Sequence, residues 1–318
     1  MAATPILLYS PSTICSNRFT DNGLGPLPPS NEKGFSHMCH EYLLTIAIPT
    51  YNRYRYVKEL IPELLNQCDE ADPGADTIEI VISDNASTDE TGDYFRRLDH
   101  DRIAYFRNVN NIGADANFIE CVKRGKGKYI WLFGDDELLC PNSVKNVAGI
   151  LLKYDIALLI TESAFKESRY FESYSDALKY SLKIDRLFPV VHTLITANVF
   201  LKQIFDIDFA RTHLPTNYGH MYGIMNGLRH GGVYVCGKDN KIIKIRDIRA
   251  DFHDPLIDIE KKLVKYVCFV GNTFNCWPAK FNVWYFYTIK NKIKSSATYN
   301  KFRKYRKKVF SLLKPASK

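Results

Sequence analysis

The sequence predicts an α/β protein built on a doubly wound, mostly parallel sheet. Between residues 43 and 161, short continuous apolar runs alternate with stretches whose apolar residues repeat at helical spacing. Polar residues follow directly after several of the apolar runs. The carboxyl ends of parallel strands meet at one edge of a sheet, where open α/β sheets bind their ligands. We therefore expect a ligand site at that edge.

The predicted strands and helices alternate strictly along this region. Strands are expected at 43–48, 77–83, 102–107, 129–133 and 156–161, and helices at 54–67, from Ser87, after Gly113 and at 142–154. Ser87 and Glu90 form a capping box, which predicts that the second helix begins at Ser87. Pro62 lies inside the first helix and is expected to kink it. Further strands are expected within 186–202 and at 241–245.

The segment KYIWLFGDDE, residues 128–137, carries the strongest chemical signal. A buried strand runs into a glycine and then into three consecutive acids, Asp135, Asp136 and Glu137. Carboxylates this close repel one another unless a positive charge lies among them. Hard oxygen ligands suit Mg²⁺ or Mn²⁺, which proteins often share with substrate phosphates. The alternative is an acidic loop that caps the helix beginning at Asn142.

The other strand ends carry polar residues that suit a nucleotide. The four loops expected at one edge of the sheet contain Thr50, Asp84, Asn111 and Asp135. Arg53 and the helix N-terminus beside it could meet phosphate, and Gly113 could allow close backbone approach to a ligand. Helix caps, solvated side chains and simple turns are the alternatives. Because the sequence has neither GxGxxG nor a P-loop, phosphates need another counter-charge, which a divalent ion would supply.

Four segments in order resemble the motifs of family 2 glycosyltransferases with the GT-A fold. They are AIPTYNR (47–53), ISDNASTDET (82–91), NNIGADANF (110–118) and GKYIWLFGDDE (127–137), and the resemblance covers about residues 42–145. It implies a mixed Rossmann-like sheet with helices on both faces. It also implies a nucleotide-sugar site at Thr50, Tyr51, Arg53, Asp84, Asn85, Asn111, Gly113 and Asp135.

The resemblance further implies a divalent metal, Mg²⁺ or Mn²⁺, bridging the donor diphosphate and held by Asp136 with help from Glu137. The family's usual Asp-x-Asp reads here as Gly134-Asp135-Asp136-Glu137, which leaves the role of Asp135 open. The metal would stabilise the charge on the departing diphosphate. Family 2 enzymes usually invert the anomeric centre in a single displacement, and this needs a general base.

The general base is the least defined part of the predicted site. In the family it is an Asp or Glu, often within a Glu-Asp pair, and residues 162–250 contain no clear pair. The candidates are Asp206, Asp208, His213 and His220. We take Asp208 as the nominal base, and His220 as an alternative base or metal contact.

Composition and charge divide the chain into four parts. Residues 1–40 are expected to form a poorly ordered extension, 41–161 the nucleotide-sugar half, 162–250 the acceptor half, and 251–318 a basic, aromatic helical region. The chain carries a net charge of +8. After Glu260 there are fifteen Lys and Arg and no acidic residue, so residues 1–260 carry 28 basic against 35 acidic residues, a balance of −7.

The C-terminal region interleaves thirteen aromatic residues with these basic ones. Its last part, 290–318, reads as a basic amphipathic helix, which suits peripheral contact with an anionic membrane. Single-stranded nucleic acid would suit the same mixture, and a helix packed on the catalytic domain is the simplest alternative. We favour the membrane and expect no nucleic acid.

The whole composition is that of a soluble globular protein, with 46% hydrophobic and 25% charged residues. No apolar run approaches the roughly 18–20 residues of a membrane span, and a secretory signal is not expected. The eight cysteines lie far apart, which predicts reduced thiols in the cytoplasm. The expectation is a cytoplasmic glycosyltransferase on the inner face of the membrane, acting on a glycan or lipid-linked acceptor. A nucleotidyltransferase and a non-enzymatic nucleotide- or nucleic-acid-binding protein are the alternatives.

Overall fold

The computed structural model describes residues 42–74, 76–163, 165–184 and 193–244, together with 262, 265–267, 269–270 and 272–274. The predicted N-terminal extension and the predicted membrane-facing segment 290–318 lie outside these residues. Within them, no helix combines the length and the apolar character that a bilayer crossing requires.

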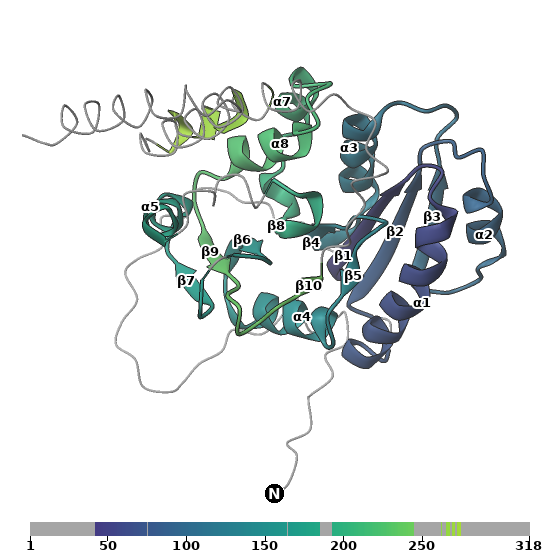
Figure 1. The fold of residues 1–318 in the computed structure, drawn as a ribbon, viewed down its shortest axis with the longest axis horizontal. Helices are drawn as coiled ribbons and strands as arrows, with labels where there is room; N and C mark the ends of the chain where they lie inside the picture. The colour runs from purple at the N-terminus through teal and green to yellow at the C-terminus, as the bar shows by residue number, and fades with distance from the viewer. Residues whose placement is uncertain are drawn as a thin grey trace, which may run out of the picture.

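The protein is organised around an eight-stranded mixed sheet (Figure 1). Its strands are β1 (Tyr42–Thr50), β2 (Ile78–Asp84), β3 (Ile103–Arg107), β4 (Gly127–Leu132), β6 (Ile156–Ile160), β7 (Arg169–Phe171), β8 (Asn198–Leu201) and β9 (Gly232–Val235). They lie in the order β3-β2-β1-β4-β8-β6-β9-β7. All pairs are parallel except those of β8 with β4 and β6, and that of β7 with β9. The predicted, mostly parallel sheet is confirmed.

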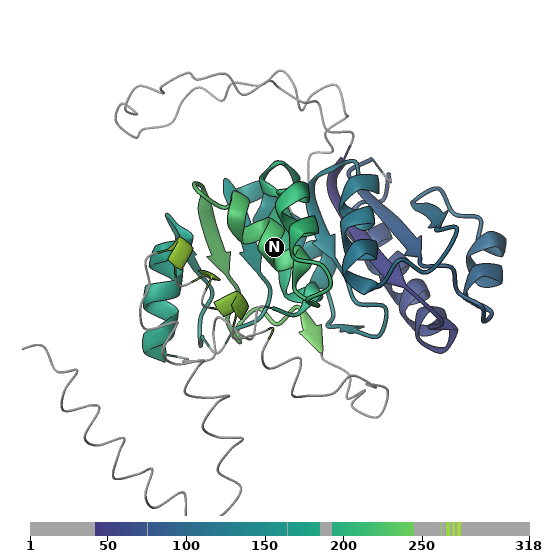
Figure 2. The same cartoon turned by 90° about the horizontal axis from the view of Figure 1, so that it is seen from above.

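Helices cover both faces of this sheet (Figures 1 and 2). They are α1 (Tyr54–Ala71), α2 (Thr91–Arg97), α3 (Ala114–Arg124), α4 (Ser143–Lys153), α5 (Tyr174–Ile184), α7 (Ile207–Thr212) and α8 (Gly219–Gly227). Apolar residues of α1, α2 and α4 form one core cluster with one face of the sheet. Residues of α3, α5, α7 and α8 form a second cluster with the opposite face. Because side chains alternate between the two faces of a strand, the strands contribute apolar residues to two separate cores.

A small second sheet lies beside the acidic segment. It pairs β5 (Leu138–Leu139) with β10 (Ile243–Lys244) in antiparallel fashion. The strand predicted at 241–245 is therefore shorter than expected, and it joins this ribbon rather than the main sheet. The pairing holds the chain that follows Glu137 against a segment about a hundred residues further on.

The second helix begins later than predicted. Helix α2 starts at Thr91, not at Ser87. The Ser87 hydroxyl instead accepts a hydrogen bond from the backbone N–H of Asn52 at 2.9 Å, and Asp89 accepts from the N–H of Thr91 at 3.0 Å. The Ser87 side chain, which the capping-box spacing assigned to the start of the helix, thus contacts the loop after β1 instead.

Two other local predictions differ from the structure. Helix α1 runs from Tyr54 to Ala71, with Pro62 inside it, and therefore ends four residues later than predicted. The return to the sheet predicted within 186–202 is confirmed at β8, although Ile195–Ala197 forms a 3₁₀ turn, not a strand, and residues 186–192 lie outside the described part of the chain.

Candidate active site

The strand ends meet at one edge of the sheet, as predicted. Thr50 and Asp84 are register partners at the ends of β1 and β2, and Asn85 N–H donates to the Thr50 carbonyl at 2.9 Å. Beyond β4, Phe133 N–H donates to the carbonyl of Ala47 in β1 at 2.9 Å. The loops after β1, β2 and β4 therefore leave the sheet side by side.

The turn after β1 is tied to the loop after β2. Asn52 adopts a left-handed backbone conformation with φ of 53°. Its Oδ1 accepts from the N–H of Thr88 at 2.7 Å, and Arg53 N–H donates to the Thr91 hydroxyl at 3.2 Å. Tyr51, just before it, remains 40% exposed. The turn thus holds an aromatic ring at the surface of the edge while its own polar groups are satisfied.

Asp84 is fully buried and fully engaged by protein groups. Its Oδ1 accepts from Ser87 N–H at 2.8 Å, and its Oδ2 accepts from the Tyr105 hydroxyl at 2.7 Å and from Arg107 Nη1 at 2.5 Å. Burial alone would raise its pKa, but these hydrogen bonds hold the pKa of Asp84 below its ordinary value. Asp84 is therefore an ionised anchor of the β2 loop in this structure, and nucleoside binding by it stays a prediction.

Asn85, Asn111 and Gly113 belong to one amide network. Asn85 Nδ2 donates to Asn111 Oδ1 at 2.8 Å and to the Gly113 carbonyl at 3.3 Å. Asn85 Oδ1 accepts from Asn108 Nδ2 and from Ile112 N–H, each at 3.0 Å. Gly113 has φ of 85°, and the space where a Cβ would lie is open. These three predicted residues are brought together, and the network fixes the loop that leads into α3.

The acidic loop contains carboxylates in different environments. Asp135 is 8% exposed, and burial with the charge of Asp136 raises its pKa to about 7, against the opposing effects of Arg53 and the Thr50 hydroxyl. Burial and the neighbouring charges of Asp136 and Glu162 raise the pKa of Glu137 to about 7. The closely spaced negative charges of this loop therefore raise the pKa values of Asp135 and Glu137.

Arg53 supplies positive charge beside the acids. Its Nη1 lies 3.7 Å from Asp136 Oδ2, and their side chains are 28% and 18% exposed. Thr50, 3% exposed, contributes an Oγ1 that has no hydrogen-bond partner of ordinary geometry among the described residues. Thr50, Arg53, Asp135 and Asp136 thus form one polar surface at the ends of β1 and β4.

The donor chemistry of this surface fits a divalent cation that is shared with a substrate. Within the described residues, no group of three or more His, Cys, Asp or Glu side chains could hold a metal by itself. Mg²⁺ is commonly bound by one or two carboxylates together with substrate phosphates. The partly exposed carboxylate of Asp136, next to the buried Asp135 and the half-buried Glu137, suits that kind of binding. It does not suit an all-protein metal cage.

The nominal base candidates are not brought together. Asp208 lies on α7 with its side chain 94% exposed, 3.5 Å from Arg211. His220, at the start of α8, is 1% exposed and contacts the Thr193 carbonyl through Nε2 at 3.3 Å. Burial lowers its pKa to about 4, partly offset by Asp115. His220 is therefore a neutral, buried imidazole at pH 7.

The remaining two candidates have structural contacts. Asp206 caps α7 by accepting from Phe209 N–H at 2.9 Å, and it also accepts from Asn226 Nδ2 at 2.8 Å. His213 stacks on Tyr222 with ring centroids 3.8 Å apart. Neither arrangement identifies a base.

Two residues at the same edge were not predicted. Glu162 follows β6, and Thr196 lies in the turn before β8 and accepts from Gly134 N–H through its hydroxyl at 2.8 Å. Glu162 comes directly after a buried apolar strand, so the strand-end argument applied to Asp84 and Asp135 would have found it. Thr196 gives no comparable signal, because its place depends on β8 running antiparallel to its neighbours.

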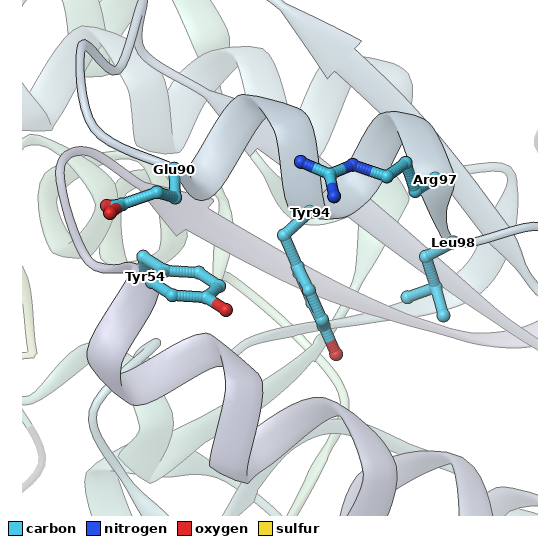
Figure 3. Close-up of a pocket in the computed structure, with 5 residues that line it drawn as sticks. All are labelled: Tyr54, Glu90, Tyr94, Arg97 and Leu98. Atoms are coloured by element: carbon cyan, nitrogen blue, oxygen red, sulfur yellow. The ribbon is translucent and has the colours of Figure 1, made fainter.

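A separate cavity of about 270 Å³ opens between the beginning of α1 and the length of α2 (Figure 3). It is lined by Tyr54, Glu90, Tyr94, Arg97 and Leu98. The rings of Tyr54 and Tyr94 meet edge to face, with centroids 5.9 Å apart. None of the predicted site residues lines it, so it is distinct from the acidic surface.

Comparison with known proteins agrees with the geometry. Residues 45–210 match the family model for glycosyl transferase family 2. The chain is 30% identical over 244 residues to the abequosyltransferase RfbV of Salmonella typhimurium. The aligned region covers 66% of this chain and 72% of that protein. It is 35% identical over 100 residues to a GalNAc(5)-diNAcBac-PP-undecaprenol beta-1,3-glucosyltransferase of Campylobacter jejuni, which covers 30% of each protein.

The fold is shared with solved structures. The complex of S. aureus TarS 1-349 with UDP-GlcNAc superposes with a TM-score of 0.55 over 80% of this chain and 76% of that one, at 14% identity. Free TarS 1-349 gives a TM-score of 0.54. At this identity the likeness shows the GT-A fold, and the family match supplies the activity class. The chain therefore belongs to glycosyl transferase family 2 and is a glycosyltransferase with the GT-A fold.

Proposed function

We propose that this glycosyltransferase takes its sugar from a nucleoside diphosphate sugar and transfers it to a glycan or lipid-linked acceptor. The observation that carries the proposal is the convergence of Thr50, Arg53, Asp84 and the acidic loop at the carboxyl edge of β1, β2 and β4. Arg53 gives a cation for phosphate oxygens, Tyr51 an exposed ring for a base to stack on, and the acids a place for a metal that neutralises the diphosphate.

The proposal includes Mg²⁺ or Mn²⁺ as the cofactor, held by Asp136 with Glu137 beside it. When bound, the ion would act as a Lewis acid for the departing diphosphate. Thr50 and Asp135 would orient the loop beneath it, and Arg53 would exchange its contact with Asp136 for one with phosphate. Single displacement with inversion, which the family resemblance implies, remains part of the proposal, and the geometry favours none of the four base candidates.

In this proposal the two halves of the domain bind different substrates. Residues 41–161 would bind the donor, and 162–250 the acceptor. A cytoplasmic site on the inner face of the membrane, with contact through 290–318, completes the proposal. The Campylobacter enzyme, whose name describes glucose transfer to a glycan linked to undecaprenol, supports a glycan or lipid-linked acceptor. Family membership argues against the nucleotidyltransferase and the non-enzymatic alternatives.

A thermal-shift panel tests the donor site. UDP-, GDP-, CDP- and dTDP-glucose, each with and without Mn²⁺, are added to the intact protein and to Asp136→Ala. A ligand that binds only the folded state raises its stability by about 2.7 kcal/mol at a hundredfold excess over Kd. We expect a metal-dependent shift with one nucleotide, lost in Asp136→Ala. Shifts that are absent throughout, or identical in the variant, would contradict the proposal.

A further inference from the structure

The unpredicted carboxylate Glu162 lies at the same level of the sheet as the acidic loop. Trp131 of β4 and Leu159 of β6 both pair with Val199 of β8. The ends of β4 and β6 therefore leave the sheet together, on either side of β8. Glu137 follows the first of these ends and Glu162 the second.

Thr196 joins the two ends. Its Oγ1 accepts from Gly134 N–H at 2.8 Å, and its carbonyl accepts from the Thr161 hydroxyl at 3.1 Å and from Trp131 Nε1 at 2.9 Å. A Cβ placed on Gly134 would lie 3.0 Å from Glu137 Cγ and 3.2 Å from Thr196 Oγ1. The stem of Glu137 and the Thr196 hydroxyl thus both border Gly134, and Thr196 also holds the chain just before Glu162.

Each of the two glutamates has one buried carboxylate oxygen that accepts no hydrogen bond. Oε2 of Glu137 and Oε2 of Glu162 are buried, and neither has a hydrogen-bond partner within the described part of the chain. The two carboxylates are close enough for the charge of Glu162 to raise the pKa of Glu137. A buried polar group that is left without a hydrogen bond destabilises the folded state. Such groups are therefore rare unless a ligand, ion or water completes them.

The other end of the Gly134–Glu137 loop is held separately. Thr50 is 3% exposed, and its hydroxyl lies against Asp135, whose pKa it lowers. The two unsatisfied glutamate oxygens, from the acidic loop and from the chain after β6, therefore belong to the Glu137 end of the loop.

The chemistry of this region selects its ligand. Two neighbouring carboxylates repel a phosphate that carries no metal. Neutral O–H donors are what paired carboxylate oxygens lack, and a sugar offers such donors on adjacent carbons. Building on the proposed function, we infer that Glu162 and Glu137 form a subsite that accepts hydrogen bonds from sugar hydroxyls.

The hydroxyls could belong to the transferred sugar or to the acceptor, and calorimetry separates these sources. One arm compares the glucose conjugate of the nucleotide that binds best with its nucleoside diphosphate. The other titrates octyl glycosides of glucose, galactose and mannose into protein saturated with that diphosphate. Both arms use the wild type, Glu162→Ala and Glu162→Gln, with Glu172→Gln as a control, because Glu172 is an exposed carboxylate after β7.

We expect Glu162→Ala to weaken the sugar-dependent part of binding in one arm by roughly tenfold or more, because sites built around a hydroxyl discriminate strongly. Glu162→Gln should lose less, since one oxygen remains. Affinity for the diphosphate alone should stay within about twofold, and this shows both that the variant is folded and that the proposed donor site is intact. Unchanged sugar binding in both arms would overturn the subsite. A wild type that binds no nucleotide would overturn the proposed function and the subsite with it.

Discussion

The guanidinium Nη1 of Arg53 lies 3.7 Å from Oδ2 of Asp136. This contact joins the turn after β1 to the loop after β4, and both side chains remain partly exposed. Without a ligand, the arginine balances the charge of the acid that we assign to the metal. A nucleoside diphosphate with its metal would supply new partners for both groups at once. We therefore propose that this pair marks the place where the donor diphosphate and its metal bind.

Arg53→Ala should weaken binding of the nucleotide sugar. A hydrogen bond from a charged group contributes about 1.5–3 kcal/mol, equivalent to roughly a ten- to hundredfold change in Kd. Isothermal titration calorimetry in the presence of Mn²⁺ measures the change. Arg55→Ala is a matched control two residues away, because Arg55 stacks over Tyr56 with 4.5 Å between its guanidinium carbon and the ring centroid. Equal affinity in the two variants would remove Arg53 from the donor site.

Arg102→Ala should strongly destabilise the fold. Arg102 is 1% exposed in its side chain and binds Asp72 at 2.8 Å and Asp69 at 2.9 Å. Removing one partner of a buried ion pair costs about 3–5 kcal/mol, because the other charge stays buried. Arg96→Ala, which breaks the exposed pair with Asp93, should cost less than about 1 kcal/mol. Urea unfolding measures both, and a similar small loss in the two variants would contradict the assignment.

Asp115→Ala should loosen the chain that leads into α8. The carboxylate of Asp115, 4% exposed, accepts from the N–H groups of Thr216, Asn217 and Gly219 at 2.7, 2.6 and 3.1 Å. Bonds to a charged group contribute about 1.5–3 kcal/mol each and are not additive, so we expect a loss of at least about 2 kcal/mol.

Hydrogen exchange locates the effect of this substitution. The three amides that lose their acceptor should exchange faster, while amides of the central strand β1 keep their protection. Glu120→Ala on the same helix, which breaks the partly exposed pair with Lys123, should leave exchange at 216–219 unchanged. Protection of these amides in Asp115→Ala equal to that in the wild type would show that Asp115 does not hold the loop.

His220 should make stability depend on pH in the mildly acidic range. Burial lowers its pKa to about 4 from an ordinary 6.5. As pH falls, the unfolded chain therefore binds the proton first, and the contribution of the neutral imidazole is lost between about 6.5 and 4. His220→Gln should lose less unfolding free energy than the wild type between pH 7 and pH 5. The exposed His230→Gln serves as the control, and an unchanged pH dependence in His220→Gln would refute the prediction.

The sequence predicted the edge of the sheet because the signal there is local. Apolar runs that end in polar residues mark the carboxyl ends of strands, and parallel pairing brings Thr50, Asp84 and Asp135 together. The start of α2 could not be predicted in this way. Its supposed cap, Ser87, binds the backbone of Asn52 on another loop, a contact that local spacing does not reveal.

The acceptor side depends even more on non-local pairing. Strand β8 enters antiparallel between β4 and β6, and this places Thr196 and Glu162 beside the acidic loop. No periodicity in the sequence indicates that insertion. Of the base candidates, which were chosen by residue type and by position in the acceptor half, Asp208 lies on an exposed helix and His220 in a buried site.

The central claim is that Asp136 and its neighbours hold the diphosphate of a nucleotide sugar with a divalent ion. Calorimetric titration of the nucleotide sugar selected by the thermal-shift panel, with Mn²⁺ and then with EDTA, tests it most directly. We predict saturable binding to the wild type and to Glu172→Gln. Asp136→Ala, or removal of the metal, should weaken that binding at least tenfold, as loss of a charge-assisted contact implies. Binding to Asp136→Ala that is as tight as binding to the wild type, or wild-type affinity that EDTA leaves unchanged, would contradict the account.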